Sequence, residues 1–232
     1  MALGQIKVST PTYNVVIPST KKQTMMRPFK VSDEKVLMLA GESKETSQMV
    51  NALKEVVGNC VENVNVEDLA SFDLEYLFLK LRAVSVGETS ELLLTCKECE
   101  MKTPVSVNID EVEVKFPEEF KTTFKINEVL AVEMKYPHLD EVAKINAGDF
   151  DSIVRLIASS VKTIFHEQES HTITEADIDD VVNILMQLNS KQFKDIQDFF
   201  EKLPKVQKPV DFVCKECKAE NHMVVEGLSN FF

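Results

Sequence analysis

The tetrapeptide Cys-Lys-Glu-Cys occurs twice in this chain of 232 residues, at Cys96–Cys99 and at Cys214–Cys217. The two copies use four of the five cysteines. Apolar and β-branched runs flank each copy, "SELLLT" and "TPVSVN" around the first and "VDFV" and "NHMVV" around the second. Each copy is therefore predicted to form a strand–turn–strand unit. A fold that uses both copies has to bring together two segments that lie far apart in the sequence.

A Cys-x-x-Cys turn directs two thiolates toward one point and supplies half of a tetrahedral zinc site. Two such turns complete the set of four ligands. We predict one structural zinc ion per chain, bound by Cys96, Cys99, Cys214 and Cys217. Common zinc ribbons separate their two turns by about 15–20 residues. The much longer interval in this chain predicts an insertion whose ends return to the same place.

Other uses of the four thiols stay open at the level of the sequence. A thioredoxin-like redox site would place one pair at a helix N-terminus, whereas both pairs here are flanked by predicted strands. An iron–sulfur cluster would also accept four thiolates, and two unrelated pairs of reduced thiols are a further alternative. His222 follows Cys217 closely and could replace one ligand. Cys60 is predicted to be a packed core thiol.

The balance of charge argues against a general nucleic-acid-binding protein. The chain has 38 acidic and 26 basic residues, a formal net charge of −12 and a sequence pI near 4.9. A field of that sign repels phosphate backbones. The N-terminal run "MALGQIKVSTPTYNVV" is not apolar enough for a signal peptide, and no segment is predicted to span a membrane. We expect a cytosolic protein, in which thiols stay reduced.

The pattern along the chain predicts a mixed fold. Two short strands, at residues 12–18 and 23–29, should form an N-terminal hairpin. Ser32 is expected to cap the first helix, and a later helix over residues 69–84 should bury Leu74, Leu77, Phe78 and Leu81. The segments expected to be helical after that are "NEVLAVEMKY", "HLDEVAKINAG", "DFDSIVRLIASSVKTIF", a helix with a Thr174–Asp177 capping box, and a helix capped by Ser190.

The predicted fold class is therefore α+β. Residues 1–90 should form the N-terminal hairpin with a helical core. Residues 91–120 and 205–232 should pair as a zinc-ribbon-like unit, with 121–204 as a helical insertion between its two halves. The C-terminal "GLSNFF" is expected either to fray or, anchored by the metal, to present Phe231 and Phe232 to a partner.

No constellation of residues suggests catalysis. The chain contains no phosphate-binding glycine loop, no H-E-x-x-H and no G-x-S-x-G, and its four histidines are scattered. We therefore predict no catalytic residue, no enzymatic activity and no small-molecule substrate.

The N-terminal half resembles a known family. The pieces that carry the resemblance are "RPF" with the following "DEKVL", and the run "FDLEYLFLKLRAVSVG" from Phe72 to Gly87. They are similar to the baseplate proteins of T-even-type contractile-tail bacteriophages, over roughly residues 11–145. The resemblance implies a role in building the baseplate hub, either as a subunit in the virion tail or as an assembly factor in the host cytoplasm. It implies other hub and tail proteins as partners. The acidic balance and the lack of a membrane-spanning segment predict that neither nucleic acid nor membrane is a partner.

A zinc-ribbon regulator that contacts nucleic acid or polymerase is the alternative function. It would need a basic, aromatic-bearing strand face near the cysteines. The lysines around both cysteine pairs are matched by glutamates, which disfavours this alternative.

Overall fold

The computed structural model describes residues 8–145 and 149–231, and the chain divides into two compact units. Unit 1 consists of residues 1–114 together with 206–232, and unit 2 consists of residues 115–205. Unit 1 is thus built from two separate stretches of sequence, which include both cysteine pairs.

The N-terminal part of unit 1 is a hairpin followed by helices. Strands β1 (Tyr13–Val16) and β2 (Gln23–Met26) pair antiparallel, as predicted, with Val15 opposite Thr24. The helical segments that follow are α1 (Val31–Ser43), α2 (Thr46–Cys60), the 3₁₀ turn η2 (Val66–Asp68) and α3 (Ser71–Ser85).

Helix α3 lies at the centre of the core of unit 1. The predicted buried face is confirmed, because Leu74, Leu77, Phe78 and Leu81 are each at most 6% exposed. Leu79 is also fully buried, so α3 is covered on more than one side. A helix with apolar residues nearly all round is stable only when it is enclosed in this way.

The buried carboxylate of Asp33 lies at the start of helix α1. Asp33 forms an ion pair with Arg27 at 2.7 Å and accepts a hydrogen bond from the backbone N–H of Lys30 at 2.8 Å. The predicted cap at Ser32 is therefore wrong, because the Asp33 carboxylate accepts the hydrogen bond from the Lys30 N–H at the N-terminus of α1. Cys60 is buried, and its thiol lies 3.6 Å from the Asp33 carboxylate. Burial raises the pKa of the Cys60 thiol to about 12. Cys60 is thus a core thiol, as predicted.

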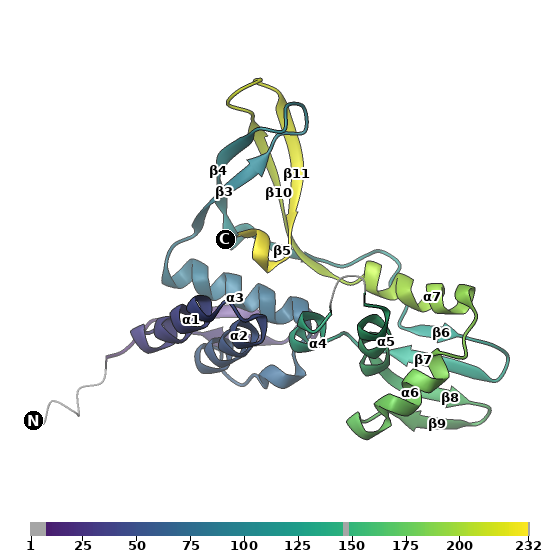
Figure 1. Cartoon of the computed structure of the whole chain (residues 1–232). Coiled ribbons are helices and arrows are strands. Elements are labelled where there is room, and N and C mark those ends of the chain that lie inside the picture. Colours follow the sequence, from purple (N-terminus) through teal and green to yellow (C-terminus); the bar gives the residue numbers. More distant parts are fainter. Residues whose placement is uncertain (1–7, 146–148, 232) are drawn as a thin grey trace, which may run out of the picture. The chain divides into compact units, whose positions relative to one another are not determined.

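Two long hairpins carry the cysteine pairs. In the first, β3 (Thr89–Thr95) pairs with β4 (Lys102–Asn108), and in the second, β10 (Lys205–Val213) pairs with β11 (Glu220–Glu226). Both strand–turn–strand predictions are confirmed. The hairpins extend side by side with their turns at the same end (Figure 1). The 3₁₀ turn η3 (Ile109–Glu111) leads to β5 (Glu113–Lys115), which lies next to β10.

The C-terminal segment belongs to the core. The 3₁₀ turn η5 (Leu228–Phe231) places Phe231 at 0% exposure, and the Ser90 hydroxyl donates to the Phe231 carbonyl at 2.9 Å. The Leu228 N–H donates to the Glu75 carboxylate at 3.2 Å. The expectation that Phe231 is presented to a partner is therefore wrong. Phe232 lies outside the described residues.

Unit 2 contains a four-stranded antiparallel sheet as well as helices, so the prediction of a purely helical block is wrong. The strands, in spatial order, are β6 (Thr123–Lys125), β7 (Leu130–Met134), β8 (Val161–His166) and β9 (Glu169–Thr172). The helical segments are α4 (Leu139–Ala143), α5 (Phe150–Ser159), the 3₁₀ turn η4 (Glu175–Asp177), α6 (Ile178–Leu185) and α7 (Ser190–Glu201). Part of the predicted helix that includes α4 lies outside the described residues.

The predicted helix "NEVLAVEMKY" contains strand β7 instead, and the predicted helix "DFDSIVRLIASSVKTIF" is confirmed in its first part as α5 but continues as β8. The two errors have a common physical cause. The runs around β7 and β8 are short and apolar, and such runs do not distinguish a strand from a buried helix by period alone. In β7, Val132 and Met134 are buried while their neighbours are only half-buried, which is the alternation of a strand. In β8, Val161, Thr163 and Ile164 are β-branched and suit the pleated surface.

Of the two helix caps predicted in unit 2, one is confirmed and the other is wrong. The Asp177 carboxylate accepts hydrogen bonds from the N–H and hydroxyl of Thr174 at 2.8 and 2.6 Å, which confirms the capping box. The predicted cap at Ser190 is wrong, because the Asn189 side chain accepts from the N–H groups of Lys191 and Gln192, both at 3.0 Å. None of the described helices is both long and apolar enough to cross a lipid bilayer.

Candidate metal centre

The two cysteine turns are built to the same plan. In the first, the Cys96 N–H donates to the Met101 carbonyl, and in the second the Cys214 N–H donates to the Ala219 carbonyl, both at 2.9 Å. A second bond closes each turn onto the carbonyl of its first cysteine. The residues that donate it, Glu100 and Lys218, have φ of 59° and 61°, in the left-handed region.

The four predicted ligand residues come together at the tips of the two hairpins. Their sulfur atoms all lie within 4.8 Å of one another. The Cys96–Cys217 and Cys99–Cys214 sulfur separations are each 3.6 Å. A tetrahedral site with Zn–S bonds of about 2.3 Å has S···S edges of about 3.8 Å. The four thiols could therefore surround a metal ion of that size with little rearrangement.

The first cysteine of each turn lies in a setting that favours the thiolate. The pKa of Cys214 is lowered to about 6. The hydrogen bond from the Cys217 N–H is the largest cause, and together with that from the Glu216 N–H it outweighs the effect of burial. Burial raises the pKa of Cys96, but the N–H groups of Cys99 and Glu98 oppose it and the net shift is downward. Thiolates are the form in which cysteine binds metals.

Each hairpin also contributes a buried polar side chain to the cysteine turn of the other. The Asn221 amide of the second hairpin donates to the Cys96 sulfur at 3.4 Å and accepts from the Lys97 N–H at 2.9 Å. The Thr103 hydroxyl of the first hairpin donates to the Cys214 sulfur at 3.7 Å. It also lies 3.4 Å from the Lys215 N–H, which donates to it. The two hairpins are thus cross-braced in both directions.

This brace was not predicted from the sequence, although the sequence carries a signal for it. Thr103 stands at position 96 + 7 and Asn221 at position 214 + 7, so both occupy the same place relative to their own cysteine pair. Thr103 and Asn221 are 2% and 3% exposed. A polar residue at the same offset in both units, within apolar strands, is the pattern that could have identified them.

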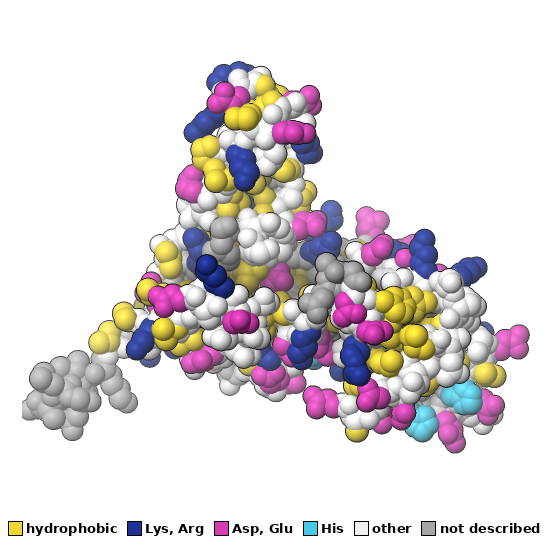
Figure 2. All heavy atoms as spheres, viewed as in Figure 1, with side chains coloured by type: hydrophobic (Ala, Val, Ile, Leu, Met, Phe, Trp, Pro, Cys, Tyr) yellow, Lys and Arg dark blue, Asp and Glu magenta, His cyan; other side chains and the backbone are white. Residues whose placement is uncertain are grey.

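His222 is not part of this cluster. Its Nδ1 lies 2.7 Å from the Asp211 carboxylate on the exposed surface of the second hairpin. Among the described residues, the four cysteines are the one group with the ligand spacing of a metal site. Figure 2 shows basic and acidic side chains mixed around the tips of the hairpins.

Four sulfur donors constrain what the site can do. Thiolates are soft ligands and favour zinc or iron–sulfur centres over magnesium or calcium. With all four positions supplied by the protein, a bound zinc ion would keep no open position for a substrate, as in structural sites.

Comparison with known proteins places the chain in a family. The family model described as "T4 bacteriophage base plate protein" matches residues 10–232. The chain belongs to this family. A curated relative, the baseplate hub assembly protein gp26 of Enterobacteria phage T4, is 23% identical over 193 residues, which are 82% of this chain and 84% of the relative. No solved structure matches the chain.

The family match extends the resemblance seen in the N-terminal half. It continues through unit 2 and the second cysteine hairpin to the C-terminus. The matched region therefore includes parts of both units and all four clustered cysteines.

Proposed function

We propose that this chain is a non-enzymatic component or assembly factor of the phage baseplate hub, and that it acts through contacts with other hub and tail proteins. The observation that carries the proposal is the family match over residues 10–232, together with a relative named as a hub assembly protein. Four protein thiolates would leave a bound zinc ion no position for a substrate. This agrees with a protein that acts through its surfaces.

We further propose that Cys96, Cys99, Cys214 and Cys217 hold one structural zinc ion. The zinc would join the hairpin before the unit 2 insertion to the hairpin after it, and so fix the C-terminal segment of unit 1 in place. The sulfur separations and the reciprocal hydrogen bonds of Thr103 and Asn221 support this assignment.

Native mass spectrometry of the purified chain tests the metal. We expect one zinc per chain, and chelation should release it and lower the melting temperature. Replacing Cys60, the cysteine outside the cluster, by serine should leave the metal content unchanged, whereas replacing Cys214 by serine should abolish it. A metal-free chain of the same stability would contradict the zinc assignment.

A phage that lacks this gene tests the role in the baseplate. We expect its lysates to contain tail components but few complete baseplates by electron microscopy, and a plasmid copy of the gene should restore them. Mass spectrometry of purified virions then separates the two forms of the proposal, because a hub subunit stays in the particle and an assembly factor leaves it. Normal baseplates without the protein would contradict both.

A further inference from the structure

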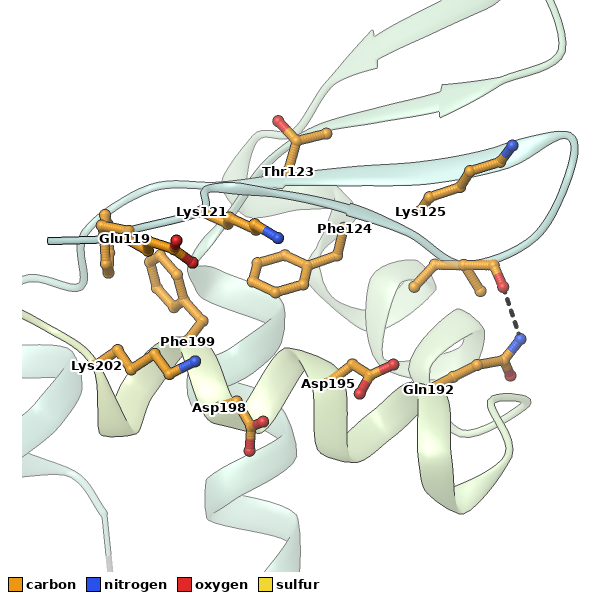
Figure 3. Close-up of a pocket in the computed structure, with 12 residues that line it drawn as sticks. Glu119, Lys121, Thr123, Phe124, Lys125, Gln192, Asp195, Asp198, Phe199 and Lys202 are labelled. Carbon is orange, nitrogen blue, oxygen red and sulfur yellow. Dashed lines mark hydrogen bonds between the residues drawn. The ribbon is translucent and has the colours of Figure 1, made fainter. Parts of the chain in front are cut away.

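A groove lies along one edge of the sheet in unit 2. It has a volume of about 380 Å³ and runs between strand β6 and helix α7 (Figure 3). Its floor is aromatic, because the Phe124 ring meets the Phe199 ring edge-to-face at 6.2 Å and Phe120 lies 5.2 Å from Phe199. Binding pockets for small ligands usually fall in the range of about 300–1,000 Å³.

Strand β6 is an edge strand, and its register shows which backbone groups face outward. The Ile126 N–H donates to the Leu130 carbonyl, and the Met134 N–H donates to the Thr122 carbonyl. In an antiparallel pair the bonded residues alternate, so Phe124 bonds to β7 while Thr123 and Lys125 direct their N–H and C=O groups away from it. Within residues 8–145 and 149–231, no backbone hydrogen bond reaches those four groups.

The side chains of the edge strand alternate in the same way. Phe124 points into the groove, whereas Thr123 points to the opposite side of the strand (Figure 3). The exposed lysines Lys121 and Lys125 stand on the β6 side of the groove, and Asp195 and Asp198 of α7 stand across from them. The two charged side chains of residues 121–125 are both lysines in a chain whose formal net charge is −12, although Glu119, just before them, also lines the groove.

We propose that the edge of β6 binds an extended segment of a partner protein, which adds to the sheet as a fifth strand. The backbone groups of Thr123 and Lys125 would supply the hydrogen-bond ladder, which is the source of affinity in strand addition. Apolar side chains of the segment would lie on the phenylalanine floor. Acidic side chains on its other face would lie beside Lys125, which points to the same side of β6 as Thr123 (Figure 3), and opposite charges on neighbouring strands attract.

The charge of the edge favours a partner over a second copy of this chain. Two β6 strands paired with each other would bring lysines of both copies side by side, and like charges in that position are destabilising. Lysines on an edge strand commonly prevent such self-association. The inference goes beyond the proposed hub role, because it names a surface and the chemistry of the segment that it accepts.

The test uses the full chain and a synthetic peptide, acetyl-Glu-Val-Thr-Val-Glu-amide. In this peptide the two valines would face the groove and the two glutamates would lie on the side of Lys125. Titration into the millimolar range, followed by amide NMR, should give saturable shifts at Thr123, Lys125 and the neighbouring turns of α7. The charge-reversed peptide acetyl-Lys-Val-Thr-Val-Lys-amide should bind about tenfold more weakly.

A matched pair of variants distinguishes the β6 edge from an edge in general. Thr123→Pro removes an outward N–H that the sheet does not use, a position where an edge strand tolerates proline. It should weaken binding about tenfold or more. Thr172→Pro is the control, because the bond from the Ile173 N–H to the Lys162 carbonyl shows that the Thr172 N–H also faces outward, on the β9 edge. It should leave binding unchanged.

Three results would overturn the proposal. The first is the absence of saturable shifts with the acidic peptide, and the second is equal binding of the two peptides. The third is concentration-dependent self-association that Thr123→Pro abolishes, which would assign the edge to a second copy. None of these results depends on whether the protein acts in the baseplate, so the hub role and the strand-binding edge can fail separately.

Discussion

At the scale of single residues, Thr103 and Asn221 link the two hairpins at the four-cysteine cluster. Each donates to a buried cysteine sulfur of the opposite hairpin and holds the backbone of the same turn. Partners that orient the ligands of a metal site typically change metal affinity about 10–100-fold when they are removed. Their identical offset from the two cysteine pairs makes them a matched pair for mutagenesis.

We predict that Thr103→Val, which removes the hydroxyl while keeping the shape, weakens zinc binding about 10–100-fold. Thr103→Ser keeps the hydroxyl and should retain most of the affinity. Competition with a chromophoric chelator measures both variants. If the valine variant holds zinc as tightly as the wild type, the hydroxyl has no part in the site.

A second prediction at the scale of single residues concerns Glu75 and the dependence of stability on pH. Burial raises the pKa of this carboxyl, and the hydrogen bond from the Leu228 N–H only partly opposes the shift. A raised pKa means that the folded state binds the proton more tightly than the unfolded state, whose value is about 4.3. The contribution of Glu75 to stability is therefore greatest below that value and is lost as the pH rises through the folded pKa.

Glu75→Gln should accordingly raise the melting temperature at pH 7, because glutamine can still accept the Leu228 bond without a half-buried charge. The gain should shrink as the pH falls toward about 4. Glu91→Gln removes the same charge from an exposed position on β3 and serves as the control for net charge. A gain that is equal at both pH values would contradict the burial argument.

At the scale of elements, the prediction from the sequence was correct where the hydrophobic pattern and the turn residues indicate the same structure. The N-terminal hairpin, the buried face of α3 and the four cysteines at two turns all follow from local signals. The prediction failed for β7 and β8, where short apolar runs fit either a strand or a helix and the pairing partner decides. It also missed Thr103 and Asn221, whose roles exist only across the two hairpins.

The C-terminal turn η5 gives the element-scale prediction. Phe231 is fully buried, so Phe231→Ala should lower the free energy of unfolding by about 3–5 kcal/mol. Ser229→Ala, at an exposed position in the same turn, should change it little. Denaturant unfolding measures both, and an unchanged midpoint for Phe231→Ala would show that the turn is not part of the core.

At the scale of the whole molecule, unit 1 is interrupted by unit 2, and its two stretches of sequence meet again at the four-cysteine cluster. The chain leaves unit 1 at Val114 and returns at Val206. Strands β5 and β10, on the two sides of the interruption, are neighbours in one sheet. Glu111 and Lys208 also form an ion pair at 2.5 Å. The two ends of the insertion therefore start from adjacent positions, which is the arrangement in which domain insertions are tolerated.

Unit 1 should consequently fold without unit 2. We predict that replacing residues 116–204 by a short Gly/Ser linker yields a chain that binds one metal ion and melts in one cooperative transition. Its melting temperature should fall on chelation, as in the full chain. The reason is that all four cysteines and both bracing residues, Thr103 and Asn221, lie in unit 1. The same linker with Cys99→Ser should lose the metal. A linker variant that binds none would show that unit 2 is needed to bring the two hairpins together.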